Sequence, residues 1–297
     1  MVIPGWQQTV SPFHPGEQAI QTKLGSRDRM EALGRRMIRD FLPEQHRQFY
    51  AQLSYLLVGT VDATGNPWAS ILVGQPGFVS ATCDRSLHIA AQPPWGDPLA
   101  SNLAVGARVG VLGIDLNTRR RNRVNGVVSE ITAQGFSLSV AQAFGNCPQY
   151  IQARQSYPVA DVPSAIHRFT GLGQAEQSLV ATADTFFIAT AYPDAADPAD
   201  AAATHGVDIS HRGGNPGFVR IAGNTLTVPD FSGNGFFNTF GNISLHPRAG
   251  LLFVDFEQGH LLYVTGRATI IWDGDPEIAD YAVRASPQGA SRARITD

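Results

Sequence analysis

The chain has 297 residues, a formal net charge of −3, 43% hydrophobic and 16% charged residues, a balance typical of a soluble globular protein. This charge gives no basic surface for nucleic acid, and no run approaches the about 20 apolar residues of a membrane helix, so neither partner is expected. The start of the sequence lacks the pattern of a signal peptide. Two scattered cysteines, Cys83 and Cys147, indicate a reducing, cytoplasmic location without a structural disulfide.

Residues 1–50 are expected to form an N-terminal helical segment, with helical pattern over 16–52. The stretch 31–42 places its apolar residues on one face and arginines on the other. Pro43 then opens a further helix, and Glu44 follows in its first turn. This part of the chain is predicted to flank a β domain.

From Ser54 the pattern changes to short strands separated by turn residues. In the first half, strands are expected at 55–62, 68–74, 87–91, 108–115 and 122–131. In the second half, they are expected at 186–192, 217–223, 225–229, 248–256 and 261–272. Five or six short strands at near-regular spacing favour an antiparallel barrel over a parallel α/β sheet.

The phrase GQPGFV at 74–79 returns as GNPGFV at 214–219, 140 residues later. The same offset aligns further pairs, namely Ser70 with Ser210, Arg108 with Arg248, Gly110 with Gly250, Leu112 with Leu252, Asp115 with Asp255 and Gly126 with Gly266. A chance match would not keep its frame over this distance, so the chain is predicted to be a tandem duplication. Because the period exceeds that of a solenoid repeat, each copy is expected to be a domain with its own core.

The predicted boundaries are a first copy at 51–140, a linker with short helices at 141–180, a second copy at 181–275 and a tail at 276–297. The linker pattern begins near 132, and its segment 144–155 is expected to be a loop that leads into a short helix. Between Thr190 and Ser210 the second copy carries an Ala-, Asp- and Pro-rich insertion, expected to be exposed and mobile. The end, 286–297, has no apolar periodicity and is expected to be frayed.

The segment DISHRGGNPGF at 208–218 combines a hydroxyl, an imidazole and a guanidinium with flexible backbone amides. This combination suits phosphate binding, and the candidate residues are Ser210, His211, Arg212, Gly213 and Gly214. The alternative is a surface hairpin whose glycines and proline serve only the turn. The first copy has Ile71 and Leu72 where the second has His211 and Arg212. The shared residues therefore belong to the scaffold, and the His-Arg pair is the candidate for function.

The segment PDFSGNGFFNTFGN at 229–242 mixes flat apolar rings with uncharged donors and acceptors. The polar candidates are Ser232, Gly233, Asn234, Asn238, Thr239 and Asn242, and the rings are Phe231, Phe236, Phe237 and Phe240. This mixture suits a planar heteroaromatic ligand. Alternatively, the phenylalanines form core and the Asn/Gly run forms a turn.

The segment NTRRRNRVNG at 117–126 places Arg119, Arg121 and Arg123 on one face of a strand. They are either a solvated turn or a cross-domain contact to an anion. Cys147 has no His or Asp partner at a useful spacing and is interpreted as a small buried hydrophobe. The histidine spacings predict no metal site, and no catalytic residue is assigned.

The stretches SHRGGNPGFV, LTVPDFSGN, FNTFGNISLHPRAGLLFVDF, LLYVTGRATIIWDG and FGNCPQYIQ cover most of 50–275. Together they resemble the FMN-binding split-barrel family of pyridoxamine 5′-phosphate oxidase, and more narrowly its double-barrel flavin-nucleotide-binding branch. The resemblance implies a mainly β fold with flanking helices, in which two tandem antiparallel split barrels of Greek-key type hold FMN between them.

The resemblance also implies that Ser210, His211 and Arg212 take the phosphate or ribityl chain. Ser232, Gly233, Asn234 and the loop 237–242 would line the flavin, and Arg121 or Arg123 of the first copy would reach the same ligand. Because the first copy has Ile71 and Leu72 instead, one phosphate-binding position per chain is expected.

The sequence departs from the oxidase at 260–266, where HLLYVTG replaces a strand whose Gln and Arg contact flavin, and its tail has no His beyond His260. Oxidation of pyridoxamine phosphate is therefore not expected. The expected function is an FMN-dependent oxidoreductase that exchanges electrons with a small molecule, oxygen or a redox partner protein. The alternatives are a non-catalytic module that binds flavin, haem or deazaflavin, and a ligand-free assembly domain. Family analogy favours pairing as a homodimer.

Overall fold

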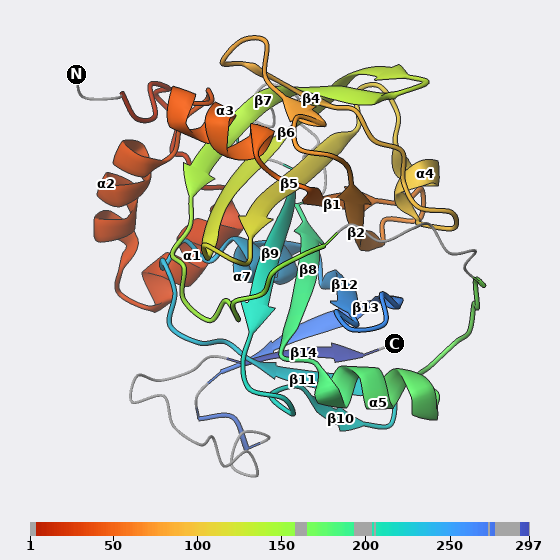
Figure 1. Cartoon of the computed structure of the whole chain (residues 1–297). Helices are drawn as coiled ribbons and strands as arrows, with labels where there is room; N and C mark the ends of the chain where they lie inside the picture. Colours follow the sequence, from red (N-terminus) through yellow and green to blue (C-terminus); the bar gives the residue numbers. More distant parts are fainter. Residues whose placement is uncertain are drawn as a thin grey trace.

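The protein is mainly β, with two antiparallel seven-stranded sheets and flanking helices (Figure 1). The computed structural model describes residues 4–157, 165–192, 204, 206–272 and 274–276, together with the backbone of 292–296. The first sheet fills the upper half of Figure 1 and the second sheet fills the lower half. Within the described residues, no helix is both long and apolar enough to cross a membrane.

The described helices are α1 (Pro15–Lys23), α2 (Arg27–Met37), α3 (Glu44–Ala51), α4 (Leu99–Asn102), α5 (Gln174–Thr182) and α7 (Asn238–Leu245). The first three lie in the stretch near the N-terminus whose pattern is helical. Helix α1 begins with a capping box, in which the His14 side chain accepts from the Gly16 amide and the Glu17 carboxyl accepts from the His14 amide. Pro15 stands at the first helical position, where its missing N–H is not needed.

The first sheet has the strand order β2-β1-β5-β6-β7-β4-β3. Its strands are β1 (Tyr55–Val61), β2 (Pro67–Val73), β3 (Val79–Ser80), β4 (Ser86–Ile89), β5 (Arg108–Asp115), β6 (Arg120–Thr132) and β7 (Gly135–Gly145). The interpretation of this region as a linker beginning near 132 is wrong, because 135–145 forms β7. This strand pairs with β6 on one side and with β4 on the other.

The second sheet repeats the first, strand for strand. Its strands are β8 (Thr185–Ala191), β9 (Val207–Gly213), β10 (Arg220–Ala222), β11 (Thr225–Pro229), β12 (Arg248–Val254), β13 (Leu261–Ile271) and β14 (Arg292–Thr296). Their order, β9-β8-β12-β13-β14-β11-β10, matches that of the first sheet with β14 in the place of β7. The common order is what the predicted duplication requires.

The expectation of a frayed C-terminal tail is wrong for 292–296, which form β14 between β11 and β13. Backbone pairing with two neighbouring strands does not require an apolar period in the sequence, so the local pattern gave no signal. The span from Thr185 to Gly213, paired across β8 and β9, is ten residues longer than the equivalent span from Tyr55 to Val73. The predicted insertion accounts for this difference, but most of it, 193–203 and 205, lies outside the described residues.

The two halves meet through a pair of glycines that the 140-residue offset relates. A Cβ added to Gly110 would lie 2.3 Å from the carbonyl oxygen of Val207, and one added to Gly250 would lie 2.2 Å from that of Pro67. Both contacts need a residue without a side chain, since real Cβ atoms do not approach oxygen so closely. Apolar residues from both sheets bury a common core around these contacts, including Leu57, Ala69, Leu112, Ile114, Phe187, Ala189, Ile209 and Leu252.

Replacing either interface glycine should weaken the contact between the halves. We expect Gly110→Ala and Gly250→Ala each to lower the free energy of unfolding by about 1–3 kcal/mol, because the added methyl overpacks against backbone that cannot move freely. Urea denaturation measures the change. Gly206→Ala is the control, because a Cβ there has no neighbour within 4 Å. An unchanged midpoint for both interface variants would contradict this account of the interface.

Candidate functional site

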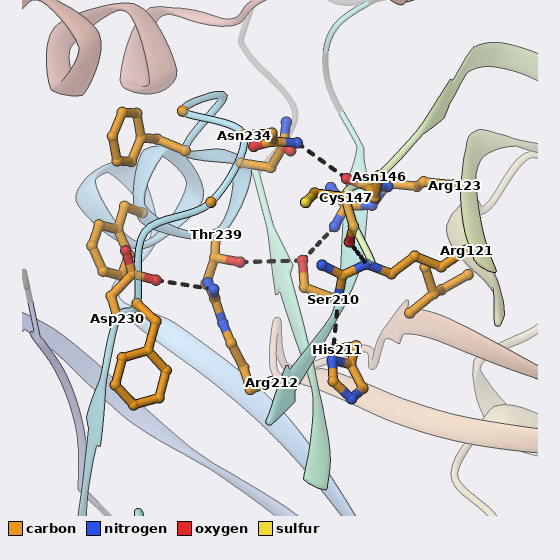
Figure 2. Close-up of a pocket in the computed structure, with 17 residues that line it drawn as sticks. Arg121, Arg123, Asn146, Cys147, Ser210, His211, Arg212, Asp230, Asn234 and Thr239 are labelled. Carbon is orange, nitrogen blue, oxygen red and sulfur yellow. Dashed lines mark hydrogen bonds and ion pairs between the residues drawn. The ribbon is translucent and has the colours of Figure 1, made fainter. Parts of the chain in front are cut away.

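A cleft lies where the first half meets the second, enclosing about 670 Å³ of space that is partly open to solvent. Strand β6 and the turn after β7 provide one wall, and β9, the segment after β11 and the start of α7 provide the other (Figure 2). Residues far apart in the sequence therefore converge at the boundary between the two copies.

Most of the predicted site residues line this cleft. They are Arg121, Arg123, Ser210, His211, Arg212, Phe231, Gly233, Asn234, Asn238 and Thr239. Gly213 lines a smaller adjoining hollow that shares Arg121, His211 and Arg212 with the cleft. The structure thus brings the three predicted segments together, although they are separated by long stretches of chain.

Three predicted residues take other roles. Gly214 leaves room for the ring of Phe218, which would lie 2.6 Å from an added Cβ. The carbonyl of Ser232 accepts a hydrogen bond from the Tyr150 hydroxyl at 3.1 Å. Asn242 is fully buried behind the cleft, so it belongs to the frame of the site and does not face a ligand.

Arg123 is buried and neutralised by Asp208. Its guanidinium donates to Asp208 Oδ1 at 2.9 Å and to Ser210 Oγ, and only 3% of the residue is exposed. Asn242 donates to the other oxygen of Asp208 at 2.7 Å. Thr239 Oγ1 completes the row at 3.4 Å from Ser210 Oγ, as Figure 2 shows. A buried ion pair held by this many hydrogen bonds fixes the position of β6 against β9.

Arg212 is the second neutralised cation. Its NH1 lies 2.9 Å from Asp230 Oδ1, and in Figure 2 the guanidinium turns toward this carboxylate across the cleft. Burial raises the pKa of Asp230 above its ordinary value, although the charge of Arg212 opposes this shift. The pair joins β9 to the residue that follows β11.

Arg121 has no such partner. Its Nε donates to the Cys147 carbonyl at 2.8 Å and its NH1 lies 3.2 Å from His211 Nδ1, but no carboxylate of a described residue lies within ion-pair distance. Burial, followed by the charges of Arg212 and Arg123, lowers the pKa of Arg121 to about 10, so it remains protonated at neutral pH. The cleft therefore contains a positive charge that no described residue neutralises.

His211 is neutral beside this charge. Burial, followed by the charge of Arg121 and then of Arg212, lowers the pKa of His211 to about 3. Since its Nδ1 accepts from Arg121, the proton resides on Nε2, which is buried without a hydrogen-bond partner in the described structure. The imidazole thus orients Arg121 and leaves one donor unused.

Some aromatic residues of 229–242 border the site, as expected for a ligand-binding surface, and others form core, as the alternative interpretation expects. Phe231 stacks on Tyr150 with ring centroids 5.0 Å apart, and both border the hollow next to the cleft. Phe236 is core, 3% exposed and in contact with Phe13 and Phe144. The expected loop 237–242 is largely helix, because α7 begins at Asn238 directly after Phe237, whose φ is 62°.

Sequence reasoning missed the contribution of α1 to the site. Glu17 is 3% exposed and contacts Asn238, a residue of the cleft wall, through its carboxyl oxygen. The contact depends on close packing of Gly16 against Gly241, since a Cβ on Gly16 would lie 2.2 Å from the Gly241 carbonyl oxygen. No local sequence pattern predicts a contact between Glu17 and Asn238, because the two residues lie far apart in the chain. Cys147, interpreted as a buried hydrophobe, is half-buried and lines the cleft.

Ionisation of Glu17 should destabilise the fold. Burial, followed by the charge of Asp208, raises the pKa of Glu17 well above its ordinary value. The stabilising, protonated form is present at low pH and is lost as pH rises through the raised pKa. We therefore expect Glu17→Gln to become progressively more stable than the wild type as the pH rises above the ordinary range of a carboxyl group. Urea denaturation at several pH values checks this difference.

Glu31→Gln serves as a control of opposite sign. Burial opposes ionisation of Glu31, but hydrogen bonds from Ser11 and Arg27 outweigh it and lower the pKa of its carboxyl. Removing this carboxylate should cost stability at neutral pH, and the cost should fade as pH falls through the lowered pKa. Parallel pH profiles for the two variants would refute the role given to Glu17.

No protein-family model and no curated protein matches the chain. Among solved structures, it is similar to the Bacillus subtilis inhibitor of motility MotI/DgrA, at 9% sequence identity and a TM-score of 0.22, over 82% of this chain and 86% of that one. At this TM-score the likeness supports no assignment of fold family or function. The chemistry of the cleft is therefore the feature of the chain that bears on its function.

Proposed function

We propose that this chain is an FMN-binding flavoprotein of two tandem split barrels, which binds FMN in the cleft between its halves. The common antiparallel strand order of the two sheets supports the tandem architecture. The resemblance of SHRGGNPGFV and LTVPDFSGN to split-barrel flavoproteins supports the choice of cofactor. Residues from both halves line the cleft, which supports its position.

The uncompensated charge of Arg121 is the observation that carries the proposal. Arg123 and Arg212 are each neutralised by a carboxylate, whereas Arg121 has only a carbonyl and a neutral imidazole as partners among the described residues. A half-buried guanidinium in this state favours an anion, and a phosphate matches its fork of donors. The Nδ1 of His211 accepts from Arg121 and thereby holds the guanidinium in place.

The remaining lining fits the other parts of a flavin nucleotide. The stacked pair of Phe231 and Tyr150 provides flat apolar surface for a ring system. Asn234 Nδ2 donates to Asn146 Oδ1 at 3.1 Å, and Asn146 Nδ2 is buried without a described partner, so this amide pair has a donor to offer. Hydroxyls of Ser210 and Thr239 suit a ribityl chain. Directed polar groups beside aromatic surface are typical of cofactor sites.

When bound, the flavin supplies the electron chemistry, and the protein supplies binding, orientation and exclusion of water. The proposal is an oxidoreductase that exchanges electrons with a small molecule, oxygen or a redox partner protein in the cytoplasm. Neutral His211 orients Arg121 and is not assigned as a general base. Pairing as a homodimer belongs to the same proposal.

The first test is an absorbance spectrum of the purified protein before and after addition of FMN and desalting. Two flavin bands that survive desalting are expected. Arg121→Gln should weaken FMN binding about tenfold or more, because a hydrogen bond to a charged group contributes about 1.5–3 kcal/mol. Arg119→Gln removes the same charge from an exposed position of the same hairpin and should bind like the wild type.

A colourless protein that does not retain FMN would eliminate the proposal, and unchanged affinity in Arg121→Gln would remove its main support. Where FMN binds, addition of a reductant and an electron acceptor separates the two functional classes. Continuous turnover is expected of an oxidoreductase. A single stoichiometric reduction would identify a non-catalytic flavin-binding module.

A further inference from the structure

The duplication defines a counterpart of the cleft on the opposite side of the interface between the halves. Strand pairing fixes the equivalence, because Arg123 lies opposite Leu112 and Tyr263 lies opposite Leu252, with 140 residues between equivalent positions. The counterparts of the cleft residues Ser210, His211, Arg212, Arg121 and Arg123 are Ser70, Ile71, Leu72, Leu261 and Tyr263, respectively.

A hydrogen bond that borders the cleft is also present beside the counterpart. Asn242 donates to Thr190 Oγ1 at 3.1 Å beside the cleft, and Asn102 donates to Thr60 Oγ1 at 3.1 Å beside the counterpart. The scaffold hydrogen bond has thus been kept in both halves while the lining has changed. The difference between the two positions lies in what fills them.

A side chain of the protein itself occupies the counterpart. Asp97 Oδ1 accepts from Ser70 Oγ at 2.5 Å and from the Leu99 amide at 2.8 Å, and Asp97 Oδ2 accepts from the Tyr263 hydroxyl at 2.8 Å. Asp97 is only 4% exposed and Ser70 is fully buried. The carboxylate thus receives donors from both halves, since Tyr263 belongs to β13 and Ser70 to β2.

The cations of the cleft are absent from the counterpart positions. Ile71, Leu261 and Tyr263 pack against the apolar core between the halves, and Leu72 is fully buried. An external anion would find hydroxyl and amide donors there but no arginine, and the donors are already used by Asp97. The counterpart therefore has the donors of an anion site and an internal carboxylate in place of the ligand.

We propose that Asp97 is the built-in occupant of a second, latent anion site, so that each chain binds one anionic ligand and uses the counterpart position as a clamp between its halves. The identification of that ligand as FMN rests on the proposed function above. The latent site itself does not, because it is defined by Ser70, Tyr263 and the Leu99 amide. Its ligand class is a small carboxylate that can replace the side chain of Asp97.

The first measurement is the stoichiometry of FMN binding to the wild-type protein by titration calorimetry. One FMN per chain is expected, and two per chain would overturn the proposal. Absence of FMN binding would instead defeat the proposed function and leave the latent site to be decided by the second measurement.

The second measurement is chemical rescue of Asp97→Ala with formate. Formate should raise the melting temperature of this variant by about 2–4 °C or more in a concentration-dependent way, because it binds the vacated donors only in the folded state. Wild-type protein and Asp115→Ala, each with formate or with chloride at equal ionic strength, are the controls. If Asp97→Ala does not fold alone, refolding is carried out with formate present. A variant that formate neither stabilises nor refolds would overturn the proposal.

Discussion

The arrangement of the protein depends on one steric constraint, the close approach of the two halves at Gly110 and Gly250. At each glycine the backbone of the other half occupies the space where a side chain would stand. This contact places β6 of the first half beside β9 of the second, so that Arg123 reaches Asp208 and Ser210. Without it, the residues of the cleft would belong to two unconnected surfaces.

Charge balance distinguishes the members of the arginine cluster. Arg123 and Arg212 are each held by a carboxylate and therefore serve the architecture of the cleft as much as any ligand. The described partners of Arg121 are a carbonyl and a neutral imidazole. Its positive charge is therefore not balanced, in a site that is partly shielded from water. The preference for an anion thus follows from the lack of a carboxylate partner for Arg121 within the described part of the chain more than from the number of arginines.

The duplication shows how one frame can serve two purposes. In both halves an asparagine holds a threonine next to the interface, yet one position is an open cationic cleft and the other is filled by Asp97 with donors from both halves. A carboxylate that is part of the chain needs no association step, so its contacts act on the stability of the folded state. The open cleft keeps its arginines, whose positive charge favours binding of an external anion.

The sequence by itself determined most of the strands, the tandem duplication and the three segments that meet at the cleft, because these follow from local alternation, turn residues and a preserved offset. The tertiary structure alone decided that β7 and β14 complete their sheets, that Glu17 of α1 contacts Asn238, and which arginine has no carboxylate partner among the described residues. Strand pairing, helix packing and ion pairing join residues far apart in the chain. Their energies depend on distance in space, which no local sequence pattern records.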